Sequence, residues 1–352
     1  MKQSVVVFNH NVYNIRQFRM SRFIEVFAGC GGLSSGLIKA GWTPVMLIDN
    51  DKNCVKTLKE NHETDTCTIE CRCVTELHLH EYRDIDLLAG GIPCQAWSQA
   101  GKRKGLADTR GNLFHDFIRL IDECEPKMFL IENVVGLTTH NHGETLNILI
   151  DMMKETKTNH IGYSITHCIL SANDYGVAQK RKRVIIVGVR NNLEKQFEYP
   201  KPLVYKPVLR DALRDVPHSV GVSYPEGKAT VMRLVPPGGC WVDLPEDIQK
   251  QYMGKSYSSG GGKRGMARRM SWDEPCLTLT TSPCQKQTER CHPEETRPFT
   301  VREYARIQSF PDSYVFMGST ANKYRQIGNA VPVELAYHVG KSLLSVLENE
   351  TL

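Results

Sequence analysis

Short apolar runs alternate with helix-like stretches over the first half of the chain. Runs with the length and composition of buried strands cover residues 23–27, 45–48, 87–89, 128–131 and 184–189. Helices are predicted between them at residues 33–40, 113–123 and 144–154. This alternation predicts an α/β fold with a doubly wound, mostly parallel sheet, in which ligands bind at the carboxyl ends of the strands.

The pattern changes after residue 190. Residues 191–296, here called the irregular region, are rich in Pro, Gly, Lys and Tyr and show little helical periodicity, so they predict a smaller, irregular second domain. Helical spacing returns at residues 300–307 and near the C-terminus. We therefore expect a main domain over residues 21–190 and a segment over 297–352 that returns to it. Residues 1–20 form an extension to which we assign no role.

Composition narrows the classes of protein. The chain has 352 residues, of which 41% are hydrophobic and 24% charged, enough for a large core. Its N-terminus offers neither a signal peptide nor a membrane span, and twelve cysteines without a signal peptide indicate reduced thiols in a cytoplasmic protein. Cys67, Cys71 and Cys73 lack a second ligand pair at zinc-finger spacing, so no metal is expected. The isolated Cys291-His292 pair is interpreted as structural.

Positive charge gathers in one part of the irregular region. The net charge of +5 is too small to indicate nucleic-acid binding by itself. Residues 251–290, however, hold seven Lys and Arg side chains against three acidic ones. This window is either a nucleic-acid surface or a solvated basic loop.

The first predicted strand runs into the glycine-rich sequence FAGCGG at residues 27–32, and the second ends at Asp49. A glycine turn before a helix lets a ligand approach the backbone, and an acid closing the next strand can bind ribose hydroxyls. Together they indicate a cofactor that contains adenosine, although a purely structural turn would look the same. The spacing does not fit a phosphate-binding GxxxxGK[ST] loop, which disfavours an NTPase.

A possible reaction centre lies at the same edge of the predicted sheet. Cys94 follows the third strand and precedes a basic loop that favours its thiolate, and Glu132 ends the fourth strand. Arg181 and Arg183 precede the last strand. A nucleophile, a carboxyl group and two guanidinium groups could activate a flat, electron-poor ring.

The ordered motifs FAGCGG, GGIPCQAWS, ENV, QKRKR, RPFTVREYARIQSFP and GNAVP resemble those of the bacterial DNA cytosine C5-methyltransferases of restriction-modification systems. The resemblance covers residues 23–190 and 297–352. It implies a Rossmann-like class I methyltransferase fold, S-adenosylmethionine as the cofactor and double-stranded DNA as the substrate. It also implies a bacterial cytosolic enzyme associated with the nucleoid, and a cognate restriction endonuclease that acts on the same site.

The resemblance further implies roles for the candidate catalytic residues. Cys94 would attack C6 of a flipped-out cytosine, Glu132 would bind its N3 and N4 edge, Arg183 would reach O2 and Arg181 would support the site. The cofactor residues that it implies are Phe27, Gly29, Gly31, Asp49, Asn50, Val74, Pro93, Asn329 and Val331. Asn50 and Cys73 depart from the residues usual at their positions, which bears on the affinity for the cofactor.

The irregular region corresponds to the variable target-recognition domain of this family. The expected DNA-contacting residues, including two from the loop after Cys94, are Ser98, Arg110, Lys263, Arg268, Arg269 and Gln287. Residues 270–293 resemble enzymes that modify GC-rich sites such as GGCC. The alternatives are a tRNA cytosine methyltransferase, whose Cys-Phe-Thr signature is absent here, and a catalytically inactive DNA-binding protein on the same scaffold.

Overall fold

A computed structural model describes residues 20–93, 112–154, 156, 161–258 and 265–347. The strands are β1 Arg22–Val26, β2 Thr43–Asp49, β3 Thr68–Cys71, β4 Leu87–Gly91, β5 Met128–Val134, β6 Tyr163–Ser171, β7 Gln179–Lys180, β8 Lys182–Arg190 and β9 Cys276–Leu277. The α-helices are α1 Gly32–Ala40, α2 Lys52–His62, α3 Asn112–Cys124, α4 Gly136–Thr139, α5 Glu144–Lys154, α6 Leu209–Ala212, α7 Glu226–Arg233, α8 Glu246–Met253, α9 Val301–Ile307, α10 Thr320–Asn329 and α11 Val333–Leu347. None of the helices in these ranges is long and apolar enough to span a membrane.

Seven strands form the main sheet, in the order β3-β2-β1-β4-β5-β8-β6. The strands from β3 to β5 pair in parallel, and β8 runs antiparallel to both β5 and β6. The predicted α/β class with a mostly parallel sheet is confirmed. Strands β3 and β6 had not been predicted, because β3 is only four residues long and β6 is an edge strand with few buried positions.

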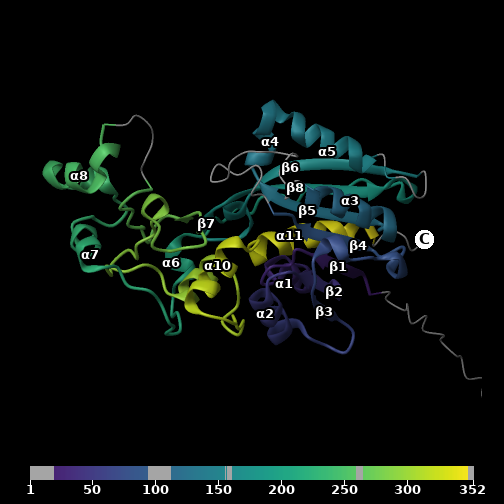
Figure 1. The fold of residues 1–352 in the computed structure, drawn as a ribbon, viewed down its shortest axis with the longest axis horizontal. Coiled ribbons are helices and arrows are strands. Elements are labelled where there is room, and N and C mark those ends of the chain that lie inside the picture. The colour runs from purple at the N-terminus through teal and green to yellow at the C-terminus, as the bar shows by residue number, and fades with distance from the viewer. Residues whose placement is uncertain (1–19, 94–111, 155, 157–160, 259–264, 348–352) are drawn as a thin grey trace, which may run out of the picture.

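Helices cover both faces of this sheet (Figure 1). Successive side chains of β1 point to opposite faces, so Phe23 enters the core beside α1 and α11 while Ile24 enters the core beside α3 and α5. Helices α1 and α11 pack closely, since a Cβ atom placed on Gly36 would lie 2.3 Å from the Cβ of Ala336. The strand order reverses between β1 and β4, and the carboxyl ends of these strands border the candidate site.

The irregular region extends away from the sheet, with α7 and α8 at its far end (Figure 1). Its own small core consists of Tyr224, Ala229, Met232, Val235, Leu244, Ala267 and Cys291. A further core joins Met270 and Cys276 of this region to Phe299 and Tyr304, which belong to the C-terminal segment. The C-terminal segment therefore packs on the irregular region before α11 returns to the sheet.

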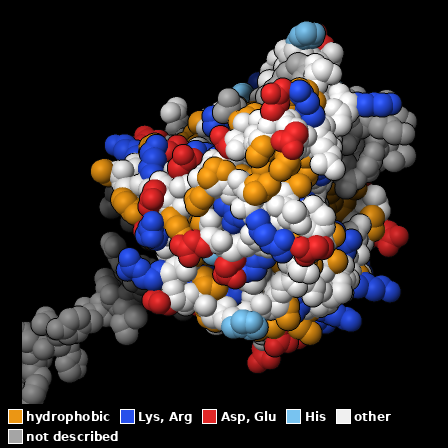
Figure 2. Space-filling view, turned by 90° about the vertical axis from the view of Figure 1, so that its left-hand side faces the viewer, with side chains coloured by type: hydrophobic (Ala, Val, Ile, Leu, Met, Phe, Trp, Pro, Cys, Tyr) orange, Lys and Arg blue, Asp and Glu red, His pale blue; other side chains and the backbone are white. Residues whose placement is uncertain are grey.

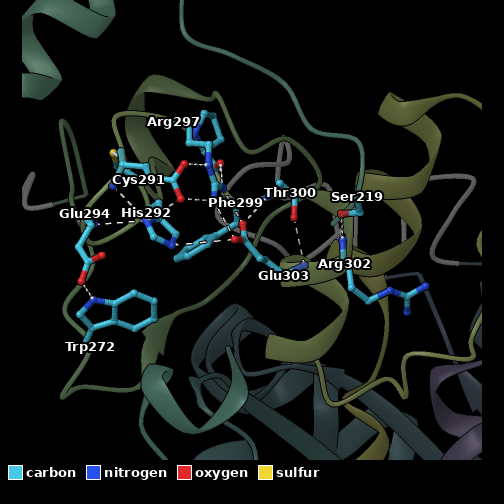
Figure 3. A network of polar contacts seen from close by, with 12 residues as sticks. Ser219, Trp272, Cys291, His292, Glu294, Arg297, Phe299, Thr300, Arg302 and Glu303 are labelled. Atoms are coloured by element: carbon cyan, nitrogen blue, oxygen red, sulfur yellow. Dashed lines mark hydrogen bonds and ion pairs between the residues drawn. The ribbon is translucent and has the colours of Figure 1, made fainter. Parts of the chain in front are cut away.

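A polar network joins the irregular region to α9 (Figure 3). The two terminal guanidinium nitrogens of Arg297 bind the carboxylate oxygens of Glu303 at 2.7 and 2.9 Å, and Arg297 also binds Glu295. His292 packs edge-on against two aromatic rings, and the Cys291 thiol is buried. These contacts make Cys291 and His292 part of the packing between the irregular region and α9.

Candidate active site

The site begins at the glycine turn between β1 and α1. Phe27, Gly29 and Gly31 all have positive φ angles, of 56°, 56° and 84°. A Cβ atom on Gly29 would meet nothing within 4 Å, whereas one on Gly31 would lie 2.5 Å from the hydroxyl oxygen of Tyr314. The space above Gly31 is thus filled by the protein itself, and Gly29 is the glycine that faces open space.

Asp49, at the end of β2, holds this turn in place. Its Oδ2 accepts a hydrogen bond from the backbone N–H of Gly29 at 2.8 Å, and its Oδ1 accepts one from the N–H of Asp51 at 2.8 Å. Burial raises the pKa of the Asp49 carboxyl, although these backbone donors oppose the shift. Asp49 therefore ties the glycine turn to the neighbouring strand as well as bordering the cleft.

Two adjoining cavities lie at the carboxyl ends of the strands. The inner one, of about 60 Å³, and the outer one, of about 150 Å³, share Phe27 and Gly91 as lining residues. Eight of the nine residues expected at the cofactor line them, and Gly31 does not. The inner cavity takes Phe27, Gly29, Asn329 and Val331, and the outer one takes Phe27, Asp49, Asn50, Val74 and Pro93.

A buried acid that was not expected lines the inner cavity. Glu25 lies near the carboxyl end of β1 and is 1% exposed, and its carboxyl group accepts a hydrogen bond from the hydroxyl of Ser34. Burial raises the pKa of Glu25 to about 8. The signal in the sequence is a single acidic residue inside an otherwise apolar strand, which we interpreted only as part of that strand.

Glu132 lines the inner cavity, and Arg183 contacts its carboxylate from the neighbouring strand. Nε of Arg183, on β8, lies 2.7 Å from Oε1 of Glu132, on β5, and both side chains are largely buried. Oε2 of Glu132 faces Gly91, at 3.7 Å from the position of a Cβ atom on that glycine. One carboxylate oxygen is thus held by a guanidinium group while the other points toward the end of β4.

Cys94, Ser98, Arg110 and Lys263 lie outside the described residues. The chain just before Cys94 is described, and there the side-chain amide of Asn133 donates a hydrogen bond to the carbonyl of Ile92 at 3.0 Å. The start of the segment that carries Cys94 is therefore anchored to β5, one residue after Glu132.

Arg181 links the start of β8 to other parts of the chain. It is 1% exposed, and its terminal nitrogens donate to the carbonyls of Leu279 at 3.3 Å and Gly328 at 3.1 Å. These contacts join the start of β8 to the irregular region and to α10. These two contacts are those of a cross-link between three parts of the chain, and the supporting role expected for Arg181 stays a prediction.

Arg269 does not suit the base-reading role that we expected for it. It is 3% exposed, and all five N–H groups of its guanidinium donate hydrogen bonds inside the irregular region. The acceptors are the carbonyls of Met232, Val235, His292 and Glu295 and the hydroxyl of Thr296. Correcting that expectation, the structure leaves no donor of Arg269 for a base edge. Arg268 is partly exposed and Gln287 is exposed.

The surface of the irregular region does not carry one uniform charge. Lys and Arg side chains alternate with Asp and Glu side chains over the end of the molecule seen in Figure 2. Several of these charges form exposed ion pairs, such as Arg233 with Glu226 at 2.8 Å and Lys250 with Glu246 at 2.6 Å. Exposed positive charge alone therefore does not identify a residue that contacts DNA. A Lys or Arg side chain without an acidic partner is the better candidate.

Within the described ranges, one group of side chains has the donors for a metal ion: His78, His80 and Glu123. Nη1 of Arg119 lies 2.6 Å from Oε1 of Glu123, and Nδ1 of His78 lies 3.0 Å from the same oxygen. The guanidinium group already neutralises this carboxylate, which leaves little reason for a cation to bind there.

Comparisons with known proteins agree on one family. The family model described as C-5 cytosine-specific DNA methylase matches residues 21–345. The chain is 52% identical to the Type II methyltransferase M.Sau96I of Staphylococcus aureus, over 96% of this chain and 79% of that protein. It is 50% identical to the Type II methyltransferase M.Eco47II of Escherichia coli, over 97% of this chain and 81% of that protein.

Solved structures show the same fold. A structure described as a DNA modification methyltransferase encoded within an Escherichia coli prophage superposes with a TM-score of 0.68 at 25% identity, covering 93% of this chain and 99% of that one. The methyltransferase EhMeth of Entamoeba histolytica gives a TM-score of 0.68 at 16% identity, covering 94% and 99%. At that identity the second likeness concerns the fold alone.

Proposed function

Because the chain belongs to the C-5 cytosine-specific DNA methylase family, it is a DNA cytosine-5 methyltransferase, and we propose that it acts through a covalent adduct between Cys94 and a flipped-out cytosine. The observation that carries this mechanism is the contact of Arg183 with Glu132, whose carboxyl group lines the inner cavity. A carboxyl group and a guanidinium group side by side match the N3, N4 and O2 edge of cytosine.

The proposed steps use these residues in turn. The Cys94 thiolate adds to C6 while Glu132 holds a proton at N3 and Arg183 donates to O2, which draws electron density from the ring. The electron pair displaced from the C5=C6 bond makes C5 nucleophilic, and C5 would take a methyl group from the donor, whose sulfur atom keeps the electron pair of the broken S–CH3 bond. Loss of the proton from C5 to solvent then restores the double bond and releases the Cys94 thiolate, and the proton at N3 returns to Glu132.

We propose S-adenosylmethionine as the methyl donor. It would supply a methyl group bound to a positively charged sulfur atom. The described residues fit such a molecule, because Phe27 and Val74 offer apolar surface and Asp49 borders the outer cavity for ribose hydroxyls. Glu25 is a buried carboxyl without an ion-pair partner among the described residues, and a cationic ligand in the inner cavity would give it one.

We further propose that the irregular region is the target-recognition domain and that the enzyme protects DNA from a cognate restriction endonuclease. The support is the naming of the relatives as Type II methyltransferases and the coverage of nearly the whole chain in those matches. The tRNA methyltransferase alternative is not favoured by this family match.

The test is transfer of a labelled methyl group from S-adenosylmethionine to duplex DNA and, in parallel, to tRNA. We expect label in DNA at cytosine C5, at positions that bisulfite sequencing maps to one short site. Transfer to tRNA without transfer to any duplex would overturn the assignment of DNA as substrate. A mixed-sequence duplex in which every cytosine is already methylated at C5 should accept no label. Label in that duplex would mean that the enzyme methylates an atom other than C5.

A further inference from the structure

Two segments of the irregular region lie side by side, at residues 265–270 and 286–291. The N–H of Cys291 donates to the carbonyl of Arg268 at 3.0 Å, and the N–H of Met270 donates to the carbonyl of Cys291 at 3.0 Å. This pairing brings Arg268 next to the end of the second segment, where Arg290 lies.

Arg268 differs from its neighbour Arg269 in having no partner among the residues that the structure describes. Its guanidinium group makes no hydrogen bond or ion pair to any residue in the described part of the chain, and its Nε is buried without an acceptor. The side chain is partly exposed, so its terminal nitrogens can reach a ligand. A half-buried guanidinium group without an anion is unfavourable, and an incoming anion would satisfy it.

Arg290 lies behind Arg268 and is held in place. It is 6% exposed, its Nη1 donates to the carbonyl of Glu289 at 2.6 Å and its Nη2 donates to the carbonyl of Thr278 at 3.1 Å. Its Nε is buried without an acceptor. Burial lowers the pKa of Arg290, and the positive charge of Arg268 lowers it further.

Glu289, the residue before Arg290, is already bound to another cation. The carboxylate of Glu289 is fully buried and bound by the ammonium group of Lys228 and the hydroxyl of Tyr252. The two guanidinium groups therefore repel one another, and no carboxylate of the described residues forms an ion pair with either of them. An anion at Arg268 would relieve that repulsion, which makes the affinity for an anion depend on both arginines.

We propose that Arg268 is the DNA-contacting arginine of the irregular region and that Arg290 is its positioning residue, so that the two guanidinium groups form one anion site for the substrate. The inference rests on the proposed role of this region in recognition. Both phosphate oxygens and the O6 and N7 acceptors of guanine are ligands for an arginine fork, and the site takes one of them.

The test compares Arg268→Gln, Arg290→Gln, Arg290→Lys and the double variant Arg268→Gln/Arg290→Gln with the natural enzyme. Arg233→Gln is the matched control, because it removes one exposed positive charge of the same region that is already paired with Glu226. The measurements are the Kd for duplex DNA at several salt concentrations, kcat and KM on duplexes that differ by one base pair, and the Kd for S-adenosylmethionine.

We expect Arg268→Gln to raise the Kd and KM for DNA with little change in the Kd for the cofactor. If the ligand is guanine, the loss is roughly five- to 150-fold on the preferred duplex and the preference at one position disappears. If the ligand is phosphate, all duplexes lose affinity equally and the slope of log K against log salt falls by about 0.9. Arg233→Gln should change none of these values.

The role of Arg290 is tested by its dependence on Arg268. We expect Arg290→Gln to weaken DNA binding in the natural enzyme and to have little effect once Arg268 is replaced, while Arg290→Lys restores part of the affinity. Equal losses in both backgrounds would show that Arg290 only maintains the fold. An Arg268→Gln enzyme with unchanged affinity, salt slope and preference would overturn the proposal, and its continued DNA methylation would leave the proposed function standing.

Discussion

Glu132 and Arg183 meet across the antiparallel strands β5 and β8, with Nε of the arginine 2.7 Å from Oε1 of the glutamate. The two residues are 51 positions apart in the sequence, and the reversal of β8 brings them to the same edge of the sheet as the carboxyl end of β4. Because Glu132 lines the inner cavity, we expect base and cofactor to meet at this carboxyl group. Substitutions at and around this pair should therefore separate chemistry from binding.

Cys94→Ser should reduce methyl transfer to below detection while folding and DNA binding persist. A serine hydroxyl at neutral pH is a far weaker nucleophile than a partly ionised thiol. The measurement is label transfer to DNA together with a denaturation-resistant protein–DNA adduct. Cys71→Ser is the control, since Cys71 is an exposed thiol at the end of β3. Substantial turnover by Cys94→Ser would remove Cys94 from the mechanism.

Glu132→Gln should slow single-turnover methylation by roughly 100- to 10,000-fold, because an amide cannot deliver a proton to the cytosine ring. The Kd for the cofactor should change much less. Glu60→Gln, at an exposed position of α2, controls for loss of negative charge and should behave as the natural enzyme. If Glu132→Gln lost cofactor binding and kept its single-turnover rate, the carboxyl group would belong to the cofactor site instead.

Arg269→Met should destabilise the irregular region by more than about 3 kcal/mol, because five acceptors, three of them in fully buried hydrogen bonds, lose a charged donor. Urea unfolding followed by the fluorescence of Trp241 and Trp272 measures the change. Arg268→Met is the paired comparison and should cost little stability, since its guanidinium group has no partner among the described residues. Equal stability losses in the two variants would contradict the different burial of these neighbours.

Glu25→Gln should make the protein more stable at pH 8.5 and change its stability little near pH 5. The pKa of Glu25 is about 8 in the folded state against 4.5 ordinarily, so the folded carboxyl keeps its proton where the unfolded one loses it. The contribution of the Glu25 carboxyl to the free energy of unfolding is therefore complete below pH 4.5 and is lost as the pH rises to 8. Because a tenfold change in proton affinity is worth about 1.4 kcal/mol, the gain in the free energy of unfolding is on the order of a few kcal/mol.

Chemical denaturation of the two proteins without cofactor, at pH 5 and pH 8.5, measures this difference. Glu60→Gln should show none, because Glu60 is exposed. A Glu25→Gln difference that did not vary with pH would mean that Glu25 is ionised in the folded protein and has a cationic partner.

The sequence by itself determined the α/β class, because strands and helices with apolar faces produce periodic patterns among neighbouring residues. It also determined the order of the motifs, and eight of the nine expected cofactor residues line the two cavities. These residues lie at strand ends and turns, which the rule for parallel sheets places at one edge. Glu25 was missed as a lining residue because a strand pattern does not say which side chain faces a cavity.

Only the tertiary structure decided between neighbouring residues in the irregular region. Arg268 and Arg269 are adjacent and chemically identical, yet one guanidinium group is unpartnered among the described residues and the other makes five hydrogen bonds. No periodic pattern in this region indicates which side chain points inward. The acceptors of Arg269 come from residues up to 37 positions away, and their convergence on one guanidinium group exists only in the folded chain.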